Sequence, residues 1–149
     1  MPIKECTSLC LDHIGWITFD IEKFERFWCN VLGYECIHTS SATEEMTRSL
    51  FKADSGAEIK RYHNYHLNST NPDIEIHYFS DHLDAPKDFH RFGINHICLN
   101  TGGQGSRTSF LESLPPEVEV KIYDNPKGWQ NIFIRDLEGN WIELREDFE

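Results

Sequence analysis

Leu11-Asp12-His13-Ile14 stands near the start of the chain, and the similar stretch Ile94-Asn95-His96-Ile97 follows 83 residues later, counted from His13 to His96. Self-similarity of this kind is the sequence signature of a repeated structural unit. A second pair supports the repeat, because Ile74-Glu75-Ile76 and Ile142-Glu143-Leu144 each lie downstream of one histidine stretch. The chain is therefore predicted to contain two copies of one unit, each with a histidine followed by a glutamate.

A helix is predicted between the histidine and the glutamate in both halves. In the first half, Asp20 is a good N-cap, apolar residues follow at helical spacing, and Gly33 suits the left-handed residue that ends a helix. In the second half, a shorter helix is expected over residues 106–114, where Ser109 and Glu112 match a capping pattern. Both helices have an apolar side that can pack on a sheet.

Strand signals follow each predicted helix, so each half reads β-α-β-β-β. The expected strands lie at about 34–39, 46–53 and 73–79 in the first half and at about 118–123, 129–135 and 140–146 in the second. Residues 54–72 are rich in Asp, Ser, Gly, Asn and Pro and are expected to form a long irregular connection, and residues 136–140 a turn. The fold class is therefore α+β: one domain of 149 residues, with module 1 at about 9–80, a linker at about 81–92 and module 2 at about 93–147.

Composition excludes several classes of partner. The chain has 25 acidic and 14 basic residues, and its net charge of −11 repels the phosphate backbone of nucleic acids. No apolar run approaches the roughly 20 residues that span a bilayer, and the first residues do not read as a signal peptide, so a cytoplasmic protein without a membrane anchor is expected. The five cysteines include no C-x-x-C pair, which favours free thiols over a zinc ribbon or a disulfide framework.

The repeated histidines and glutamates are candidate metal ligands. Side chains alternate across a strand, so Glu75 and Glu143, each between apolar neighbours, point away from the face that those neighbours bury. His13 and His96 are expected on the same open face, where His77 is an alternative to Glu75. Two imidazoles and two carboxylates suit one divalent ion such as Zn, Ni, Co, Mn or Fe, and the sequence does not select among these metals.

The same stretches resemble the vicinal oxygen chelate superfamily, which includes glyoxalase I, methylmalonyl-CoA epimerase, extradiol dioxygenases, and fosfomycin and bleomycin resistance proteins. The resemblance is carried by Leu11 to Gly15, the stretch Val31-Leu32-Gly33-Tyr34, Gly93 to Ile97, and Asp136 to Leu144. It implies two βαβββ modules that form an open, U-shaped, eight-stranded mixed sheet with helices on its outer face, in a homodimer.

By this resemblance His13, Glu75, His96 and Glu143 fall on the family's metal-ligand positions. The family's shared chemistry is chelation of two neighbouring oxygens of a small-molecule substrate by the metal. The leading hypothesis is therefore a metal-dependent, glyoxalase-like isomerase, lyase or epimerase. Glu75, Glu143 or Glu44 would act as its catalytic base, since Glu44 lies near the position of the epimerase's catalytic glutamate.

Three departures from family patterns bear on the activity. Trp16 and Phe79 replace the arginine and asparagine that glyoxalase I would use for glutathione, and Phe133 replaces the tyrosine common in extradiol dioxygenases. Two alternatives remain: a non-haem Fe(II) extradiol-type dioxygenase with His13, His96 and Glu143 as its ligands, or a metal-free protein that binds a small molecule in an aromatic cleft.

Overall fold

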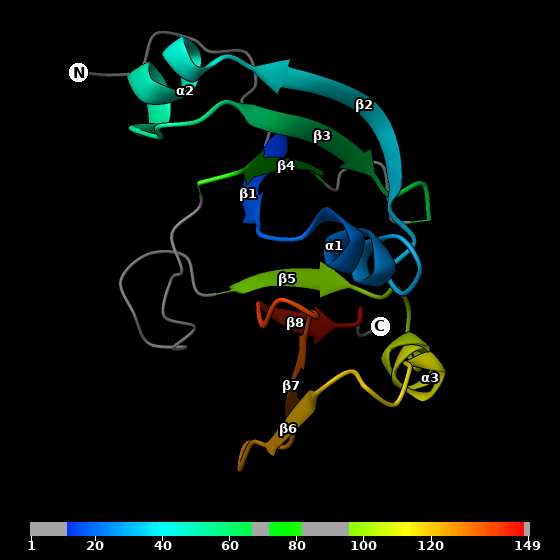
Figure 1. Ribbon diagram of the computed structural model, residues 1–149. Coiled ribbons are helices and arrows are strands. Elements are labelled where there is room, and N and C mark those ends of the chain that lie inside the picture. Colours follow the sequence, from blue (N-terminus) through cyan, green and yellow to red (C-terminus); the bar gives the residue numbers. More distant parts are fainter. Residues whose placement is uncertain (1–11, 67–71, 82–95, 148–149) are drawn as a thin grey trace, which may run out of the picture.

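The computed structural model describes residues 12–66, 72–81 and 96–147. Eight strands and three helices occur within these ranges (Figure 1). In chain order they are β1 (His13–Thr18), α1 (Ile21–Trp28), β2 (Glu35–Ala42), α2 (Glu44–Phe51), β3 (Ala57–His63), β4 (Asp73–Phe79), β5 (His96–Asn100), α3 (Ser106–Ser113), β6 (Val120–Asp124), β7 (Gln130–Arg135) and β8 (Trp141–Arg145).

The strands form two four-stranded mixed sheets with the same topology. The first has the order β1-β4-β3-β2 and the second the order β5-β8-β7-β6. In each sheet the first strand of the module pairs in parallel with the last, and the other pairs are antiparallel. The α+β class and the two repeated modules are confirmed, and the two sheets are not closed into a barrel.

The hydrophobic core lies between the two sheets, with α1 at its centre. Phe24, Phe27 and Trp28 of α1 are buried together with isoleucines of β4 and with apolar residues of β7 and β8. Figure 1 shows α1 between the pair β1 and β4 on one side and the pair β5 and β8 on the other. One helix therefore covers the apolar faces of both sheets. The opposite faces carry the polar side chains, together with a small buried cluster of Ala42, Ala57 and Phe79 in the first sheet.

The first helix begins as its sequence predicts. The Asp20 side chain accepts a hydrogen bond from the Lys23 backbone N–H at 3.0 Å, and Gly33 has a φ of 79° in the turns that follow the helix. In the second half, all three predicted strands are present with bounds shifted by at most two residues. The predicted cap at Ser109 is wrong, because α3 begins after Gly105 and Ser109 donates to the Gly105 carbonyl instead.

The prediction for residues 46–72 is wrong in two places. The segment expected as a strand at 46–53 is the helix α2, and the segment expected as an irregular connection contains β3. Helix α2 starts with an N-cap, Thr43, whose side chain accepts from the Met46 N–H at 3.3 Å, and with two acidic residues in its first turn. These local signals favour a helix over the predicted strand. Charged residues along β3 concealed its alternation, while Tyr62 within it is fully buried.

The turn at 136–140 is present and also joins the two modules. Gly139 has a φ of 87° and donates to the Asp136 carbonyl. The Glu138 carboxylate accepts from the Thr18 hydroxyl and the Phe19 N–H at 2.7 Å each, and the indole of Trp28 donates to Asp136 at 3.2 Å. The second module is thereby fixed to the start of α1.

Two further predictions concern the chain as a whole. Part of the predicted linker, residues 82–92, lies outside the described residues. Within the described part, no helix is long and apolar enough to cross a membrane.

Candidate metal centre

The first predicted ligand pair, His13 and Glu75, lies on neighbouring parallel strands. Glu75 pairs with Gly15, two residues from His13, so both side chains stand on the face opposite the buried isoleucines of β4. His13 Nε2 lies 3.9 Å from Glu75 Oε1. The two side chains are 39% and 24% exposed, so this pair is accessible from the open face of the first sheet.

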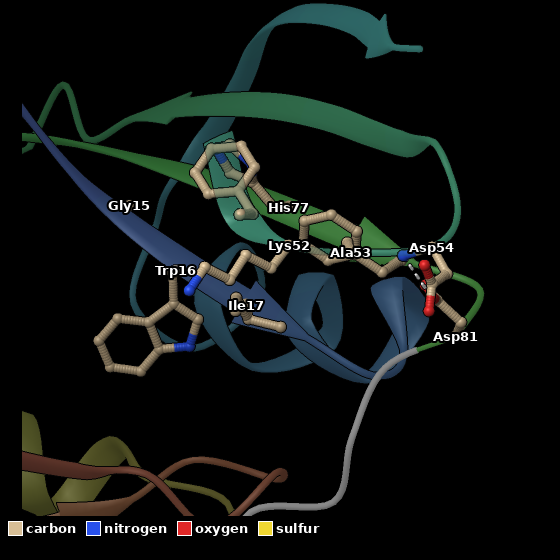
Figure 2. Close-up of a pocket in the computed structure, with 10 residues that line it drawn as sticks. Gly15, Trp16, Ile17, Lys52, Ala53, Asp54, His77 and Asp81 are labelled. Carbon is tan, nitrogen blue, oxygen red and sulfur yellow. Dashed lines mark hydrogen bonds between the residues drawn. The ribbon is translucent and has the colours of Figure 1, made fainter. Parts of the chain in front are cut away.

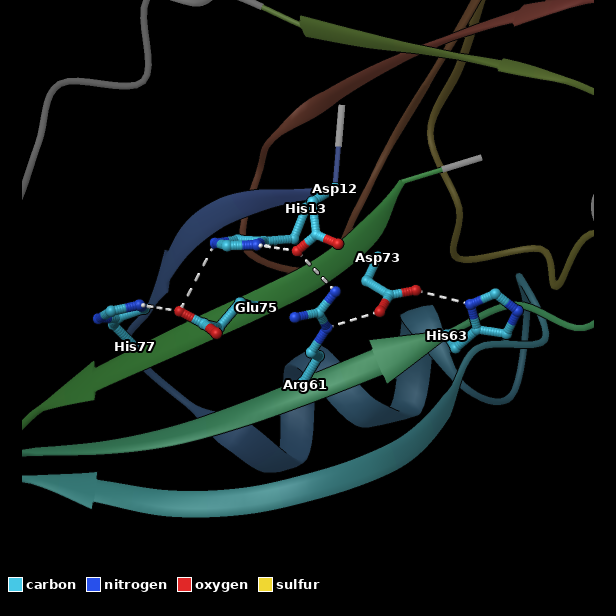
Figure 3. Close-up of polar contacts among 7 residues, drawn as sticks. All are labelled: Asp12, His13, Arg61, His63, Asp73, Glu75 and His77. Atoms are coloured by element: carbon cyan, nitrogen blue, oxygen red, sulfur yellow. Dashed lines mark hydrogen bonds and ion pairs between the residues drawn. The ribbon is translucent and has the colours of Figure 1, made fainter. Parts of the chain in front are cut away.

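Asp12 orients the imidazole of His13. Its carboxylate accepts from His13 Nδ1 at 2.9 Å, which leaves Nε2 directed at Glu75 (Figure 3). Asp12 also accepts from Arg61 at 2.9 Å, and these two partners hold the pKa of Asp12 below its usual range. A carboxylate on the second ring nitrogen is the usual support of a metal-binding histidine, because it fixes the tautomer and raises the basicity of the ligating nitrogen.

Arg61 connects His13 and Asp12 to the start of β4 and the end of β3. Its Nε donates to Asp73 at 2.6 Å, and His63 also hydrogen bonds to Asp73 at 2.6 Å (Figure 3). Burial opposes ionisation of Asp73, but the hydrogen bonds from His63 and Arg61 outweigh it, so its pKa is lowered. We call the pair His13 and Glu75 the first half-site and the pair His96 and Glu143 the second. A network of charged hydrogen bonds through Asp12, Arg61 and Asp73 therefore holds the first half-site in place.

His77 competes with His13 for the same carboxylate oxygen. Its Nε2 donates to Glu75 Oε1 at 3.0 Å, which is closer than His13 (Figure 3). His77 is only 14% exposed and contacts the ring of Phe51 at 5.3 Å between ring centres. In this arrangement His77 supports Glu75 from one side, which is compatible with Glu75 as the ligand and His77 as its hydrogen-bond donor.

The second predicted pair, His96 and Glu143, repeats this geometry on β5 and β8. His96 Nε2 lies 3.5 Å from Glu143 Oε2, and the side chains are 31% and 21% exposed. Phe133 packs edge-on against His96 at 5.2 Å between ring centres. Cys98 pairs with Glu143 across the strands, and burial together with the Glu143 charge raises the pKa of its thiol to about 11. Without a metal, the thiol is therefore protonated at neutral pH.

The two pairs do not converge within one chain. Among residues 12–66, 72–81 and 96–147, no three histidine, cysteine, aspartate or glutamate side chains come together as a group able to hold a metal ion. The reason is the position of α1, which lies between the two sheets (Figure 1) and packs on apolar residues of both. Because side chains alternate across a strand, the polar faces of the two sheets then point away from α1. Each chain carries two half-sites.

Each half-site nevertheless fits a divalent metal by the chemistry and spacing of its donors. Imidazole nitrogens and carboxylate oxygens bind such ions at about 2.0–2.2 Å, so neighbouring ligands of one ion lie roughly 3–3.5 Å apart. The separations of 3.5 and 3.9 Å are near this range, and both pairs face away from the core.

A cavity of about 660 Å³ lies beside the first half-site (Figure 2). Its walls come from β1, β4 and the end of α2, and they include Trp16, Phe51, Phe79 and His77. Volumes of roughly 300–1,000 Å³ with largely apolar walls and few polar groups are typical of small-molecule sites. A smaller cavity of about 450 Å³ adjoins Glu143 in the second half-site.

Glu44, the third candidate base, is not part of either half-site. It lies in the first turn of α2 with its side chain 69% exposed, 4.0 Å from Arg48, and it does not line the larger cavity. Two residues of the site were not singled out from the sequence. Asp12 precedes His13 directly, and this adjacency could have indicated that the two side chains interact. Lys52 lines the cavity, but it was missed because residues 46–53 were predicted as a strand and not as a helix that ends at Lys52.

Comparison with known proteins gives the chain a family context. The family model described as the Glyoxalase/Bleomycin resistance protein/Dioxygenase superfamily matches residues 10–144. No curated protein sequence shows a significant match to the chain.

Several solved structures share the fold. A glyoxalase family protein from Bacillus cereus is 15% identical with a TM-score of 0.72, covering 100% of this chain and 99% of its own. The trypanothione-dependent glyoxalase I of Leishmania major is 16% identical with a TM-score of 0.60, covering 93% and 87%. The fosfomycin resistance protein FosX of Listeria monocytogenes, in complex with Mn(II) and 1S,2S-dihydroxypropylphosphonic acid, is 23% identical with a TM-score of 0.54, covering 93% and 92%. At these identities the likeness concerns the fold.

Proposed function

The chain belongs to the Glyoxalase/Bleomycin resistance protein/Dioxygenase superfamily, and within it we propose a metal-dependent isomerase or lyase that acts on a small metabolite bound through two neighbouring oxygens. The observation that carries this proposal is the repeated pair of histidine and glutamate, 3.9 Å apart in one module and 3.5 Å apart in the other. Manganese in the FosX structure shows that a relative of this fold takes a divalent ion.

Four side chains would hold the ion: His13, Glu75, His96 and Glu143. The bound metal would supply Lewis-acid polarisation of the substrate oxygens. Asp12 would keep His13 in the tautomer whose Nε2 is available, and His77 would orient Glu75 through its 3.0 Å hydrogen bond. A carboxylate would collect the proton next to the polarised carbonyl, and Glu75 and Glu143 are the candidates, because Glu44 lies outside both half-sites.

A homodimer would complete the centre. Because the two half-sites of one chain face apart, four ligands can meet when the first module of one chain faces the second module of its partner. The two sheets that α1 separates within a chain would then form the two walls of one open cavity between chains. Two-fold symmetry would produce two such centres in the dimer.

Coordination favours proton transfer over oxygen insertion. If His13, Glu75, His96 and Glu143 all held the metal, a substrate bound through two oxygens would leave little room for dioxygen. Phe133, which contacts His96 edge-on, carries no hydroxyl that could transfer a proton. The dioxygenase would need Glu75 to stay off the metal.

The test begins with elemental analysis of protein purified without chelator, where one divalent ion per chain is expected and the His96→Ala and Glu143→Ala variants should lack it. The loaded protein is then incubated in deuterated water with α-hydroxy ketones, hemithioacetals and acyl thioesters, and with catechols in an oxygen electrode. Deuterium incorporation without oxygen uptake is the expected result. Oxygen uptake with ring cleavage would favour the dioxygenase, and a protein without metal would favour the small-molecule binding protein.

A further inference from the structure

Lys52 has an unusual backbone conformation at the edge of the larger cavity. It is the only residue other than glycine with a positive φ among the described residues, with φ 56° and ψ 31°. It ends α2, and its N–H donates to the Thr47 carbonyl in the left-handed cap that usually takes glycine. A side chain retained where glycine would be favoured is a reason to look for a function of that side chain.

The Lys52 side chain brings a positive charge into a largely apolar cavity. Figure 2 shows it extending along the cavity towards Trp16, while Asp54 and Asp81 lie at the opposite end. Asp81 is already occupied, since it accepts from the Ser55 hydroxyl and from the Asp54 N–H. In the part of the chain that the structure describes, none of the lysine ion pairs involves Lys52.

The other walls suit an apolar body next to that charge. Phe51 is 50% exposed and Ile17 is 59% exposed, and both line the cavity. Gly15 lies opposite Glu75 in the sheet, and a Cβ built at Gly15 would meet no atom within 4 Å. The cavity therefore runs from the ammonium of Lys52 to the strand position beside the proposed ligand Glu75.

We propose that Lys52 binds the anionic group of a small organic acid, a carboxylate or a phosphonate, whose apolar part packs on Phe51, Ile17 and Phe79. This assignment rests on the proposed function insofar as it makes the ligand the substrate of the adjacent metal centre. It names the substrate as a small anion with an apolar body. An ammonium group forms a stronger hydrogen bond with an anionic oxygen than with the oxygen of a neutral amide of the same shape.

The test uses metal-free full-length protein, so that it does not depend on the metal centre. Three probes of similar shape are titrated while the tryptophan fluorescence and the heat of binding are recorded: phenylacetate, benzylphosphonate and the neutral phenylacetamide. The variants are Lys52→Gly, which removes the charge and suits the backbone, Lys52→Arg, which keeps the charge, and Gly15→Leu, which fills the cavity. Lys127→Gln, on the hairpin between β6 and β7, is the control for net charge.

The wild-type protein and the Lys127→Gln variant should bind at least one of the two anions and should bind the amide more weakly. Lys52→Gly should weaken anion binding about ten-fold or more and leave amide binding unchanged, Lys52→Arg should retain anion binding, and Gly15→Leu should abolish binding of all three probes. Preference for one of the two anions assigns the group as carboxylate or phosphonate. Equal affinity of Lys52→Gly and wild type for both anions would overturn the proposal. If the protein purified without chelator contains no metal in elemental analysis and yet binds the anions, Lys52 is an anion site and the proposed metal-dependent enzyme is rejected.

Discussion

Glu138 connects the two halves of the chain through one carboxylate. It is 7% exposed and accepts hydrogen bonds from the Thr18 hydroxyl and from the backbone N–H groups of Phe19 and Asp20. Burial raises its pKa, and the three donors oppose that rise. The carboxylate thus satisfies polar groups at the junction of β1 and α1 that have little access to water.

Replacement of Glu138 by alanine should therefore destabilise the protein. We expect the free energy of unfolding to fall by about 2–3 kcal/mol, because partly buried donors lose their acceptor. Chemical denaturation of Glu138→Ala measures this, and Glu112→Ala on the exposed side of α3 is the matched control. A loss of less than 0.5 kcal/mol, roughly the effect of an ordinary surface substitution, would show that water replaces the carboxylate.

Glu25 gives the stability a defined dependence on pH. Burial opposes its ionisation, but hydrogen bonds from Lys60 and Tyr62, each 2.8 Å long, lower its pKa below 4.5 overall. A carboxyl whose pKa is lower in the folded than in the unfolded state stabilises the fold above the unfolded value. This contribution is lost as the pH falls below 4.5 and through the folded pKa.

The Glu25→Gln variant should be less stable than the wild type at pH 7 by about 1 kcal/mol, a modest value because Glu25 is 38% exposed and water screens the pair. The difference should shrink as the pH is lowered below 4.5. Urea unfolding at a series of pH values measures it, with Glu22→Gln on the exposed side of α1 as control. A difference that stays constant across this pH range would contradict the assignment.

Individual site residues were predictable to the extent that local alternation fixes them. Ile74 and Ile76 around Glu75, and Ile142 and Leu144 around Glu143, are all buried, so the predicted faces of the two glutamates are correct. The adjacency of Asp12 and His13 suggests a contact, but it does not specify that the carboxylate binds Nδ1 and leaves Nε2 directed at Glu75.

At the scale of single elements, α2 shows where sequence patterns mislead. A strand was predicted over residues 46–53, yet this segment is a helix on which Met46, Leu50 and Phe51 are 46%, 61% and 50% exposed. Thr47 is the fully buried residue of α2, and its hydroxyl donates within the helix and to the Ser55 carbonyl at 2.6 Å. Only Phe51 of these three apolar side chains lines the larger cavity, so the position of a large apolar residue in the core or at the surface could not be read from its type alone.

The end of α2 also carries a stability prediction. Lys52→Gly should raise the free energy of unfolding by about 1 kcal/mol, since the left-handed conformation costs roughly 1–2 kcal/mol for a residue with a Cβ. Thermal unfolding should shift upwards by about 2–4 °C for a chain of this length. The same replacement at Lys23, in the first turn of the right-handed helix α1, should lower stability. A loss of stability in Lys52→Gly would show that the lysine side chain itself holds the cap.

At the scale of the whole molecule, the repeat predicted the two modules, whereas their relative placement could not be read from the sequence. The predicted meeting of both pairs at one site assumed that all four side chains lie on the same open face of one sheet. In the structure α1 contacts apolar residues of both sheets, including Ile132, Ile134 and Ile142 of the second. Contacts of this kind depend on tertiary packing between segments about a hundred residues apart, and no local pattern specifies them.

Complementation between two inactive variants tests whether the centre forms between chains. His13→Ala destroys the first half-site of its chain and leaves the second intact, and His96→Ala does the reverse. If each centre combines the first module of one chain with the second module of its partner, a mixed dimer contains one centre with both defects and one with none. Mixing the two metal-free variants, under conditions that exchange subunits, should therefore restore metal binding to about half of the mixed dimers' sites.

The amount of recovered metal follows from the composition of the mixture. At equal concentrations mixed dimers form about half of the population, so total metal should reach about a quarter of the wild-type amount. Light scattering should give twice the chain mass of 17.5 kDa. Centres formed within single chains would all remain defective in the mixture, and the absence of recovered metal in a confirmed mixed dimer would contradict the arrangement between chains.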